Sequence, residues 1–244
     1  MKEFWLDWGK WKLKPKNDWK ERAKKIAALE AVKHVKDGFV VGLGSGSTAA
    51  YAIAEIGRRI QEEEIEVLGI PTSTQAFYLA IRHGIPLTTL DEHPTIDLTI
   101  DGADQIDKKL NLIKGMGGAL TREKIVASCS KKVIIVADET KLVEKLGENH
   151  PIPIEIVPFA AKYVISKIEE LGGKPKIREA KGKVGPVITD NGNYILDVTF
   201  KQIENLTELN KKLKLITGIV ETGLFLNLAH QAYLGKKDGN LIKL

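Results

Sequence analysis

The chain has 244 residues, of which 43% are hydrophobic and 28% charged, as in a soluble globular protein rather than a disordered or collagen-like one. No apolar run reaches the roughly 18–20 residues of a membrane-spanning helix. The single cysteine, Cys129, excludes an internal disulfide framework and a four-thiolate zinc site.

The net charge of +5 is concentrated at the start of the chain. Residues 1–36 hold eleven basic and five acidic residues, a net charge of +6, so the remainder carries −1. A basic face can attract nucleic acid or membrane phosphate, but we favour a solvated helix face. The first residues are too charged for the apolar core of a secretory signal, so we expect a cytoplasmic protein.

Residues 1–20 form an N-terminal extension rich in Trp and Lys. Such a segment could lie on a membrane surface. Indole rings bury a large area at small entropic cost, so we instead expect the extension to dock on its own domain or on a neighbouring subunit. Its tryptophans are Trp5, Trp8, Trp11 and Trp19.

Strands and helices are predicted to alternate through the first part of the chain. Asp18 and Glu21 resemble a capping box, and the helix that follows is predicted to end near Lys36. The alternation favours an open, largely parallel sheet covered on both faces. The predicted strands are 39–43, 65–70, 86–90, 96–100 and 132–137; the predicted helices are 48–64 and 71–82, and 101–131 is irregular and then helical.

After Pro151 the pattern changes to β-α-β-β-α-β, the order of a ferredoxin-like unit. An Asp-Asn-Gly-Asn turn at 190–193 precedes one of its strands. Residues 231–234 and 241–244 are predicted to pair as a hairpin. The predicted strands of the unit are 154–157, 174–178, 194–200 and 218–224, and its helices are 160–171 and 206–213.

The first candidate for chemistry is the segment Gly42–Thr48, between a predicted strand and a helix. Its glycines let consecutive amides point into one concavity, its hydroxyls add donors, and the helix N-terminus favours an anion. Ser47 breaks the dinucleotide-binding fingerprint, and no Gly-Lys-Ser/Thr follows as in a nucleotide P-loop. We therefore expect a phosphate monoester here rather than an ordinary turn.

The second candidate is Asp101-Gly102-Ala103-Asp104, directly after an apolar strand. Ligands of open α/β sheets lie outside the carboxyl ends of the strands. The two carboxylates could bind a metal, exchange protons or hold sugar hydroxyls, or they could only stabilise a turn. The acid spacing of a calcium loop is absent.

The third candidate is the glycine-rich segment Lys114–Lys124, which leads into another helix. Glu123 falls in the first turn of that helix, where the helix dipole favours an ionised carboxylate that can act as a base. Lys114 could neutralise an oxyanion, helped by neighbouring amides. A solvated helix start is the alternative.

No metal site is expected. The five histidines are scattered along the chain and no His-Glu-x-x-His occurs. Cys129 lies within a predicted helix, and we interpret it as a small buried apolar residue rather than a reactive thiolate.

Taken together and in this order, these motifs resemble the type A ribose-5-phosphate isomerase family. The resemblance runs from about Lys24 to the C-terminus, and its specific parts are 42–48, 101–104, 114–124, 137–141 and 187–193. It implies an α/β protein with a Rossmann-like catalytic domain, an open and mostly parallel sheet with helices on both faces, and a smaller ferredoxin-like α+β lid. The expected division is 1–20 for the extension, 21–150 with 228–244 for the catalytic domain, and 151–227 for the lid and oligomerisation domain.

The implied reaction is the interconversion of D-ribose 5-phosphate and D-ribulose 5-phosphate through an enediolate, without metal or cofactor. It implies a homodimer or homotetramer and no nucleic acid or membrane partner. Matched residue by residue, Glu123 is the base, Asp101 and Asp104 handle the sugar hydroxyls, and Lys114 stabilises the oxyanion. The residues matched to substrate and phosphate binding are Lys24, Gly44, Ser45, Gly46, Ser47, Thr48, Gly115, Gly117, Gly118 and Lys141.

Three features depart from the family pattern. Met116 stands where a further glycine is expected, and it is strained if the position needs a positive φ. Gln105 replaces an acid beside the aspartate pair, which would alter hydroxyl contacts but not the base. Residues 1–20 lie outside the resemblance.

Two other functions remain open from the sequence. A non-catalytic sugar-phosphate sensor would use the same sheet, although the start of the chain supplies only one convincing helix for a helix-turn-helix unit. A CoA transferase-like enzyme would use a glutamate nucleophile, but the short phosphate loop and the lysines suit a monoester better.

Overall fold

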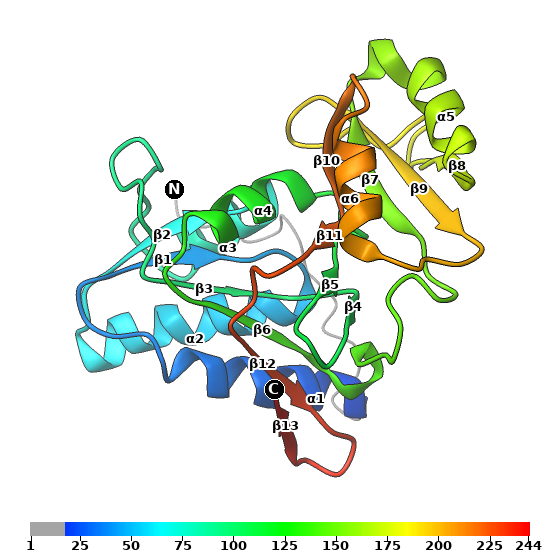
Figure 1. Cartoon of the computed structure of the whole chain (residues 1–244). Helices are drawn as coiled ribbons and strands as arrows, with labels where there is room; N and C mark the ends of the chain where they lie inside the picture. Colours follow the sequence, from blue (N-terminus) through cyan, green and yellow to red (C-terminus); the bar gives the residue numbers. More distant parts are fainter. Residues whose placement is uncertain (1–17) are drawn as a thin grey trace.

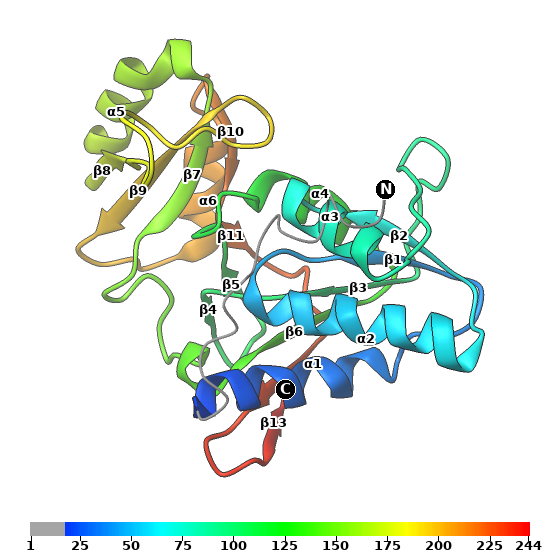
Figure 2. The ribbon, with the colours of Figure 1, turned by 180° about the vertical axis from the view of Figure 1, so that it is seen from behind.

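The computed structural model describes residues 18–244, which form three β-sheets with flanking helices (Figures 1 and 2). The six-stranded sheet has the order β13-β12-β6-β3-β1-β2. All its neighbouring strands are parallel except β13, which pairs antiparallel with β12. The strands are β1 (Phe39–Leu43), β2 (Val67–Pro71), β3 (Leu98–Asp101), β6 (Val133–Asp138), β12 (Gln231–Gly235) and β13 (Leu241–Lys243).

Helices cover both faces of this sheet, as the sequence predicts. Helices α1 (Trp19–Val32) and α2 (Ser47–Glu63) lie along one face, where Ala27 and Ile53 join a core with Val41 of β1. Helix α3 (Thr74–Arg82) packs beside α2. Helix α4 (Leu120–Ser128) covers the opposite face (Figure 1). Because the central strands are covered on both sides, they are apolar almost without interruption.

The four-stranded sheet is antiparallel and has the order β10-β7-β9-β8. With its two helices it has the ferredoxin-like arrangement expected from β-α-β-β-α-β. Figure 1 shows it beside one end of the large sheet. Its elements are β7 (Ile152–Ile156), α5 (Ala161–Glu170), β8 (Gly173–Ile177), β9 (Tyr194–Phe200), α6 (Leu206–Lys214) and β10 (Ile219–Thr222).

A small sheet of order β11-β5-β4 lies between the two larger ones, and the sequence does not predict it. Its strands are β4 (Gln105–Ile106), β5 (Leu112–Ile113) and β11 (Leu224–Phe225), too short to show a period. The predicted strand 218–224 is wrong as one piece, because β10 and β11 separate at Gly223. A side chain there would meet the Lys114 carbonyl oxygen at 2.4 Å. Two 3-10 helices, η1 (Glu139–Lys141) and η2 (Pro158–Ala160), complete the elements.

Two further predictions of local structure need correction. Residues 86–90 do not form a strand; only Leu87 bridges to Gly69. Helix α1 ends at Val32 rather than near Lys36. Its N-cap is Asp18, whose carboxylate accepts a hydrogen bond from the Lys20 amide.

The capping box at the start of α1 is only half formed. The carboxylate of Glu21 accepts from the Lys24 ammonium and the Tyr51 hydroxyl instead of closing the box. The predicted docking of the extension falls mainly on residues 1–17, with Trp5, Trp8 and Trp11, which lie outside the described residues, whereas Trp19 is the first residue of α1. Within residues 18–244, no helix combines the length and apolar character that crossing a membrane requires.

Candidate active site

A cavity of about 490 Å³ opens at the carboxyl ends of the parallel strands, beside β1 and β3. Strands β2 and β3 follow β1 in sequence but flank it on opposite sides, so the chain reverses direction across the sheet here. Such a switch point is where open α/β sheets bind ligands. The cavity is lined by all the predicted site residues except Gly44 and Asp101.

One end of the cavity is built by the start of α2. Gly46 has φ 95°, a conformation that favours glycine, and it turns the chain from β1 into the helix. The Ser45 hydroxyl hydrogen-bonds those of Thr72 and Ser73, while the Ser47 hydroxyl accepts a bond from the Lys24 ammonium at 3.1 Å. This end combines a helix N-terminus, hydroxyls and a cation, which is suited to an anion.

Lys141 adds a second cation to this end of the cavity, from η1 after β6. Lys24 and Lys141 are far apart in the sequence, since α1 precedes β1 and η1 follows β6. Together they can balance a dianionic phosphate, whose charge at pH 7 is about −1.5 to −2.

Gly44 and Asp101 lie behind the cavity wall rather than on it. A Cβ at Gly44 would lie 2.3 Å from Asp101 Oδ1, so this glycine allows close approach of the two segments, and it does not line the cavity. Asp101 is 2% exposed. Its Oδ1 accepts bonds from the amides of Ser45 and Gly102.

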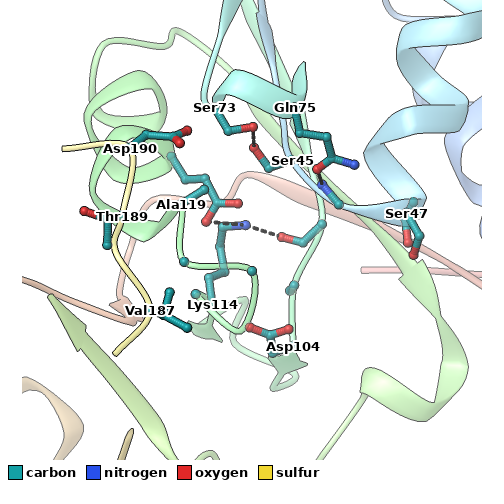
Figure 3. Close-up of a pocket in the computed structure, with 18 of the residues that line it drawn as sticks. Ser45, Ser47, Ser73, Gln75, Asp104, Lys114, Ala119, Val187, Thr189 and Asp190 are labelled. Carbon is teal, nitrogen blue, oxygen red and sulfur yellow. Dashed lines mark hydrogen bonds and ion pairs between the residues drawn. The ribbon is translucent and has the colours of Figure 1, made fainter. Parts of the chain in front are cut away.

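The buried centre of the site is Lys114. Its ammonium lies 3.0 Å from Asp101 Oδ2 and 3.2 Å from Glu123 Oε2, and it donates to the Gly102 carbonyl oxygen at 2.6 Å. Figure 3 shows the last two contacts as dashed lines. Burial lowers the pKa of Lys114, but the charges of Asp101, Glu123 and Asp104 raise it by more. Lys114 therefore stays cationic inside the protein.

Glu123 points into the cavity from the first turn of α4 and is 5% exposed. Burial raises the pKa of its carboxyl above the usual 4.5, and the Asp101 charge raises it further, while Lys114 opposes both. From the sequence, we expect the helix dipole to favour the ionised form of Glu123, but burial and the Asp101 charge raise the pKa of this carboxyl instead. Glu123 Oε2 is close enough to Lys114 for an ion pair but forms no hydrogen bond within residues 18–244. A buried carboxylate with a free lone pair and a raised pKa is a suitable base.

The glycine run beside Lys114 needs glycine at two positions. Gly115 has φ 107° and Gly118 has φ 79°. Met116 has no positive φ, so the expected strain is absent. Its amide donates to Asp104 Oδ2 at 2.9 Å, which holds Asp104 at the cavity.

Support for this loop comes from the four-stranded sheet. The Arg178 guanidinium, paired with Asp197, donates to the carbonyl oxygens of Gly115 and Met116 at 2.8 and 3.0 Å. Gln105 does not face the cavity. Its amide oxygen instead accepts a hydrogen bond from the Gly147 amide at 2.9 Å.

Two parts of the wall were not predicted from the sequence. Ser73 and Gln75 follow β2, and Val187 to Asp190 come from the segment between β8 and β9 (Figure 3). The polar run after β2 was a usable signal, because parallel strands end at one edge of the sheet. Within residues 18–244, no three or more His, Cys, Asp or Glu side chains group to hold a metal ion.

Comparison with known proteins shows the family of this chain. Residues 68–239 match the family model described as ribose 5-phosphate isomerase A, or phosphoriboisomerase A. Ribose-5-phosphate isomerase A of Methanosarcina acetivorans is 51% identical over 216 residues, covering 88% of this chain and 91% of that protein.

Solved structures agree as well. Ribose 5-phosphate isomerase A of Methanocaldococcus jannaschii has a TM-score of 0.86 at 49% identity, covering 91% of this chain and 97% of the other. A D-ribose-5-phosphate isomerase in complex with phospho-erythronic acid has a TM-score of 0.89 at 44% identity, covering 92% and 98%. The chain belongs to the ribose 5-phosphate isomerase A family.

Proposed function

We propose that this chain interconverts D-ribose 5-phosphate and D-ribulose 5-phosphate with Glu123 as the base that moves the carbon-bound proton. The observation that carries the proposal is the buried pair of Lys114 and Glu123 at one end of a cavity whose other end suits a phosphate. The reaction needs a base and an oxyanion partner at two adjacent carbons and a handle at the far end of the sugar.

The phosphate would bind at the start of α2, against Ser45, Ser47 and Thr48, with Lys24 and Lys141 as counter-charges. The lining of the cavity supports this placement. A related isomerase has been solved with phospho-erythronic acid, which carries a phosphate as the proposed substrate does. Binding energy at this end would hold the first two carbons against Glu123.

At the other end Glu123 would take the proton from C2 of the open-chain aldose. The electron pair moves into a C1–C2 double bond, and the former carbonyl oxygen gains the negative charge, which Lys114 would stabilise. Glu123 then returns the proton to C1, while the hydroxyl proton moves from O2 to O1. Because the transferred proton returns to the same substrate, the enzyme ends each cycle unchanged.

The two aspartates would take different roles. Asp104 faces the cavity and would bind the sugar hydroxyls and move the oxygen-bound proton. Asp101 is buried behind Lys114, so we assign it to hold the ammonium in place rather than to touch the sugar. Lys114 would supply the positive charge that the enediolate needs, and we propose a reaction without metal or cofactor.

We also propose that the chain works as a homodimer or homotetramer in the cytoplasm, with the unit 151–227 acting as lid and oligomerisation domain. Exposed apolar side chains on that unit, including Phe159, Tyr163 and Leu215, support an interface there. The extension would dock on the domain or on a neighbouring subunit. Sizing of the chain with and without residues 1–17 tests both proposals.

The direct test of function is incubation with ribose 5-phosphate while ketose formation is followed. Steady conversion in both directions is the expected result. Binding without conversion would instead favour a sugar-phosphate sensor, and transfer of CoA to an acid without conversion would favour a CoA transferase-like enzyme.

A further inference from the structure

Glu155 is a fully buried carboxylate outside the cavity, on strand β7. No lysine or arginine within residues 18–244 forms an ion pair with it. Burying an unpaired charge is costly unless hydrogen bonds compensate. Four donors do so here: the Thr121 hydroxyl at 2.6 Å, the Thr189 hydroxyl at 2.9 Å, and the side-chain amides of Asn191 and Asn193 at 3.0 and 2.8 Å.

Three of these donors belong to residues 187–193, which we call the cavity turn. Its first part, from Val187 to Asp190, lines the cavity. The Thr189 hydroxyl also accepts from the amides of Asn191 and Asn193, so the turn is wrapped around Glu155. The fourth donor, Thr121, lies on α4 two residues before Glu123. Glu155 therefore connects the cavity turn to the helix that carries the proposed base.

Three further hydrogen bonds, from Thr74 and Arg122, hold the cavity turn against helices α3 and α4. The Thr74 amide at the start of α3 donates to Asp190 Oδ2 at 2.8 Å. The Arg122 guanidinium donates to Asn191 Oδ1 and to the Asp190 carbonyl oxygen at 2.7 and 2.8 Å. The hydrogen bonds from Thr74 and Arg122 are exposed to solvent, whereas those that Glu155 accepts from the cavity turn are buried or partly buried. Glu155 is thus the internal anchor of the turn.

The cavity turn borders the reactive end, and at Asp190 it also reaches the start of α3 beside the Ser73 hydroxyl of the phosphate end. In Figure 3, Val187, Thr189 and Asp190 lie on the same side of the cavity as Lys114, across from Ser47. The Thr189 hydroxyl points away from Lys114. A proton held briefly by a carboxylic acid exchanges with water wherever water reaches it, so what covers this end decides whether the proton returns to the sugar.

We propose that Glu155 is a positioning residue that holds the cavity turn over the reactive end, so that water is kept from the proton carried by Glu123. The inference rests on the proposed function, in which that proton moves from C2 to C1. It assigns a role in the reaction to a residue that touches neither substrate nor cavity.

The test uses ribose 5-phosphate deuterated at C2 and the Glu155→Gln variant of the full chain. Deuterium retained at C1 of newly formed ribulose 5-phosphate is measured by mass spectrometry before the back-reaction contributes. We expect partial retention in the wild type and a loss of retained deuterium in the variant. We also expect kcat to fall roughly ten- to a hundredfold, as for a displaced active-site wall, with a smaller change in KM. Retention is a ratio within each turnover, so loss of folded protein does not change it.

The matched control is Glu221→Gln. Glu221 pairs with Glu155 across β10 and β7, but it binds Lys124 and Lys214 and not the cavity turn. The Glu221→Gln variant should retain as much deuterium at C1 as the wild type does. If Glu155→Gln does not fold, Asn193→Ala removes one donor to Glu155 and should lower retention in the same direction.

The possible outcomes separate the two proposals. Unchanged retention in the folded Glu155 or Asn193 variant overturns the inference, and so does a wild type that retains no deuterium; both leave the isomerase function intact. A wild type that forms no ketose at all overturns the proposed function.

Discussion

The ammonium nitrogen of Lys114 lies 3.2 Å from Oε2 of Glu123, and the two side chains are only 4% and 7% exposed. A cation beside a base would by itself weaken the base. Here the burial of Glu123 and the charge of Asp101 outweigh that effect and raise the pKa of Glu123. The arrangement lets one residue remove a proton while its neighbour meets the charge that this creates.

Glu123→Gln should abolish turnover while ribose 5-phosphate still binds. The amide keeps the shape of the side chain but cannot accept the C2 proton, and general-base catalysis is worth roughly 10²–10⁴-fold. Steady-state assays and calorimetric titration with ribose 5-phosphate measure the two effects. Glu62→Gln, on the exposed surface of α2, is the matched control. Turnover near the wild-type rate in the Glu123 variant would contradict the assigned base.

Lys114→Ala should lower kcat by about 10²–10³-fold, as for loss of an oxyanion donor, and raise KM much less. It should also destabilise the fold by roughly 3–5 kcal/mol, because Asp101 and Glu123 are left as buried charges without their cation. Thermal unfolding measures the second effect. Lys108→Ala, which removes a solvent-exposed partner of Glu144, is the control. A change confined to KM would rule out the oxyanion role.

The pH dependence of kcat should show an acid limb above pH 4.5. Glu123 can accept a proton only when ionised, and its pKa lies above the usual 4.5, so activity rises as pH passes the raised value. Asp101→Asn removes a charge that raises this pKa, and the limb should move to lower pH in the residual activity. A limb that stays in place would show that another group controls it.

The raised pKa of Glu123 also makes the stability of the fold depend on pH. A carboxyl whose folded pKa is raised stabilises the fold below its unfolded pKa, and this contribution is lost as pH rises through the folded value. The Glu123→Gln variant has no carboxyl group at this position, so it does not lose stability in this way as pH rises. The unfolding temperature of the variant should therefore gain on the wild type as pH increases above 4.5, and equal shifts at all pH values would argue against a raised pKa.

Sequence reasoning located most of the cavity because its residues follow parallel strands. The segments after β1, β3 and β6 are far apart in the chain, but the carboxyl ends of those strands meet at one edge. The predicted ferredoxin-like order is confirmed for a different reason: strands and helices of ordinary length show a hydrophobic periodicity that can be recognised in the sequence. The short strands β4, β5 and β11 have too few residues to do so.

What the sequence could not show is which side of a wall a residue faces. Asp101 and Asp104 are three positions apart, yet only Asp104 reaches the cavity. Nor could local patterns show that Asp190 meets the amide of Thr74, 116 positions earlier, because that contact depends on how the unit of the four-stranded sheet packs against the six-stranded one. The fully buried Glu155 carries no local signal at all, since its four donors lie on two other segments.

Removal of metal ions should leave the reaction unchanged. The positive charge at the enediolate would come from Lys114, which stays cationic because the charges of Asp101, Glu123 and Asp104 raise its pKa. Dialysis against a chelator, followed by assay in metal-free buffer, is the measurement. A loss of activity that returns with a divalent cation would contradict the proposed metal-free mechanism.

Gly44→Ala should damage the site although Gly44 does not line it. The added Cβ would lie 2.3 Å from Asp101 Oδ1 and 2.6 Å from the Asp101 Cα atom. A backbone atom cannot move aside cheaply, so overpacking should cost about 1–3 kcal/mol of stability. Asp101 would be displaced, and Lys114 would lose one of its two carboxylate partners.

The expected result of Gly44→Ala is a lower kcat together with a lower unfolding temperature. Gly182→Ala is the control, because a Cβ at Gly182 has no atom within 4 Å and the residue has no positive φ. If Gly44 instead served only to admit the phosphate, the variant would keep its stability and kcat and lose affinity alone. Measuring kcat, KM and unfolding temperature on both variants therefore decides between close packing behind Lys114 and direct contact with the ligand.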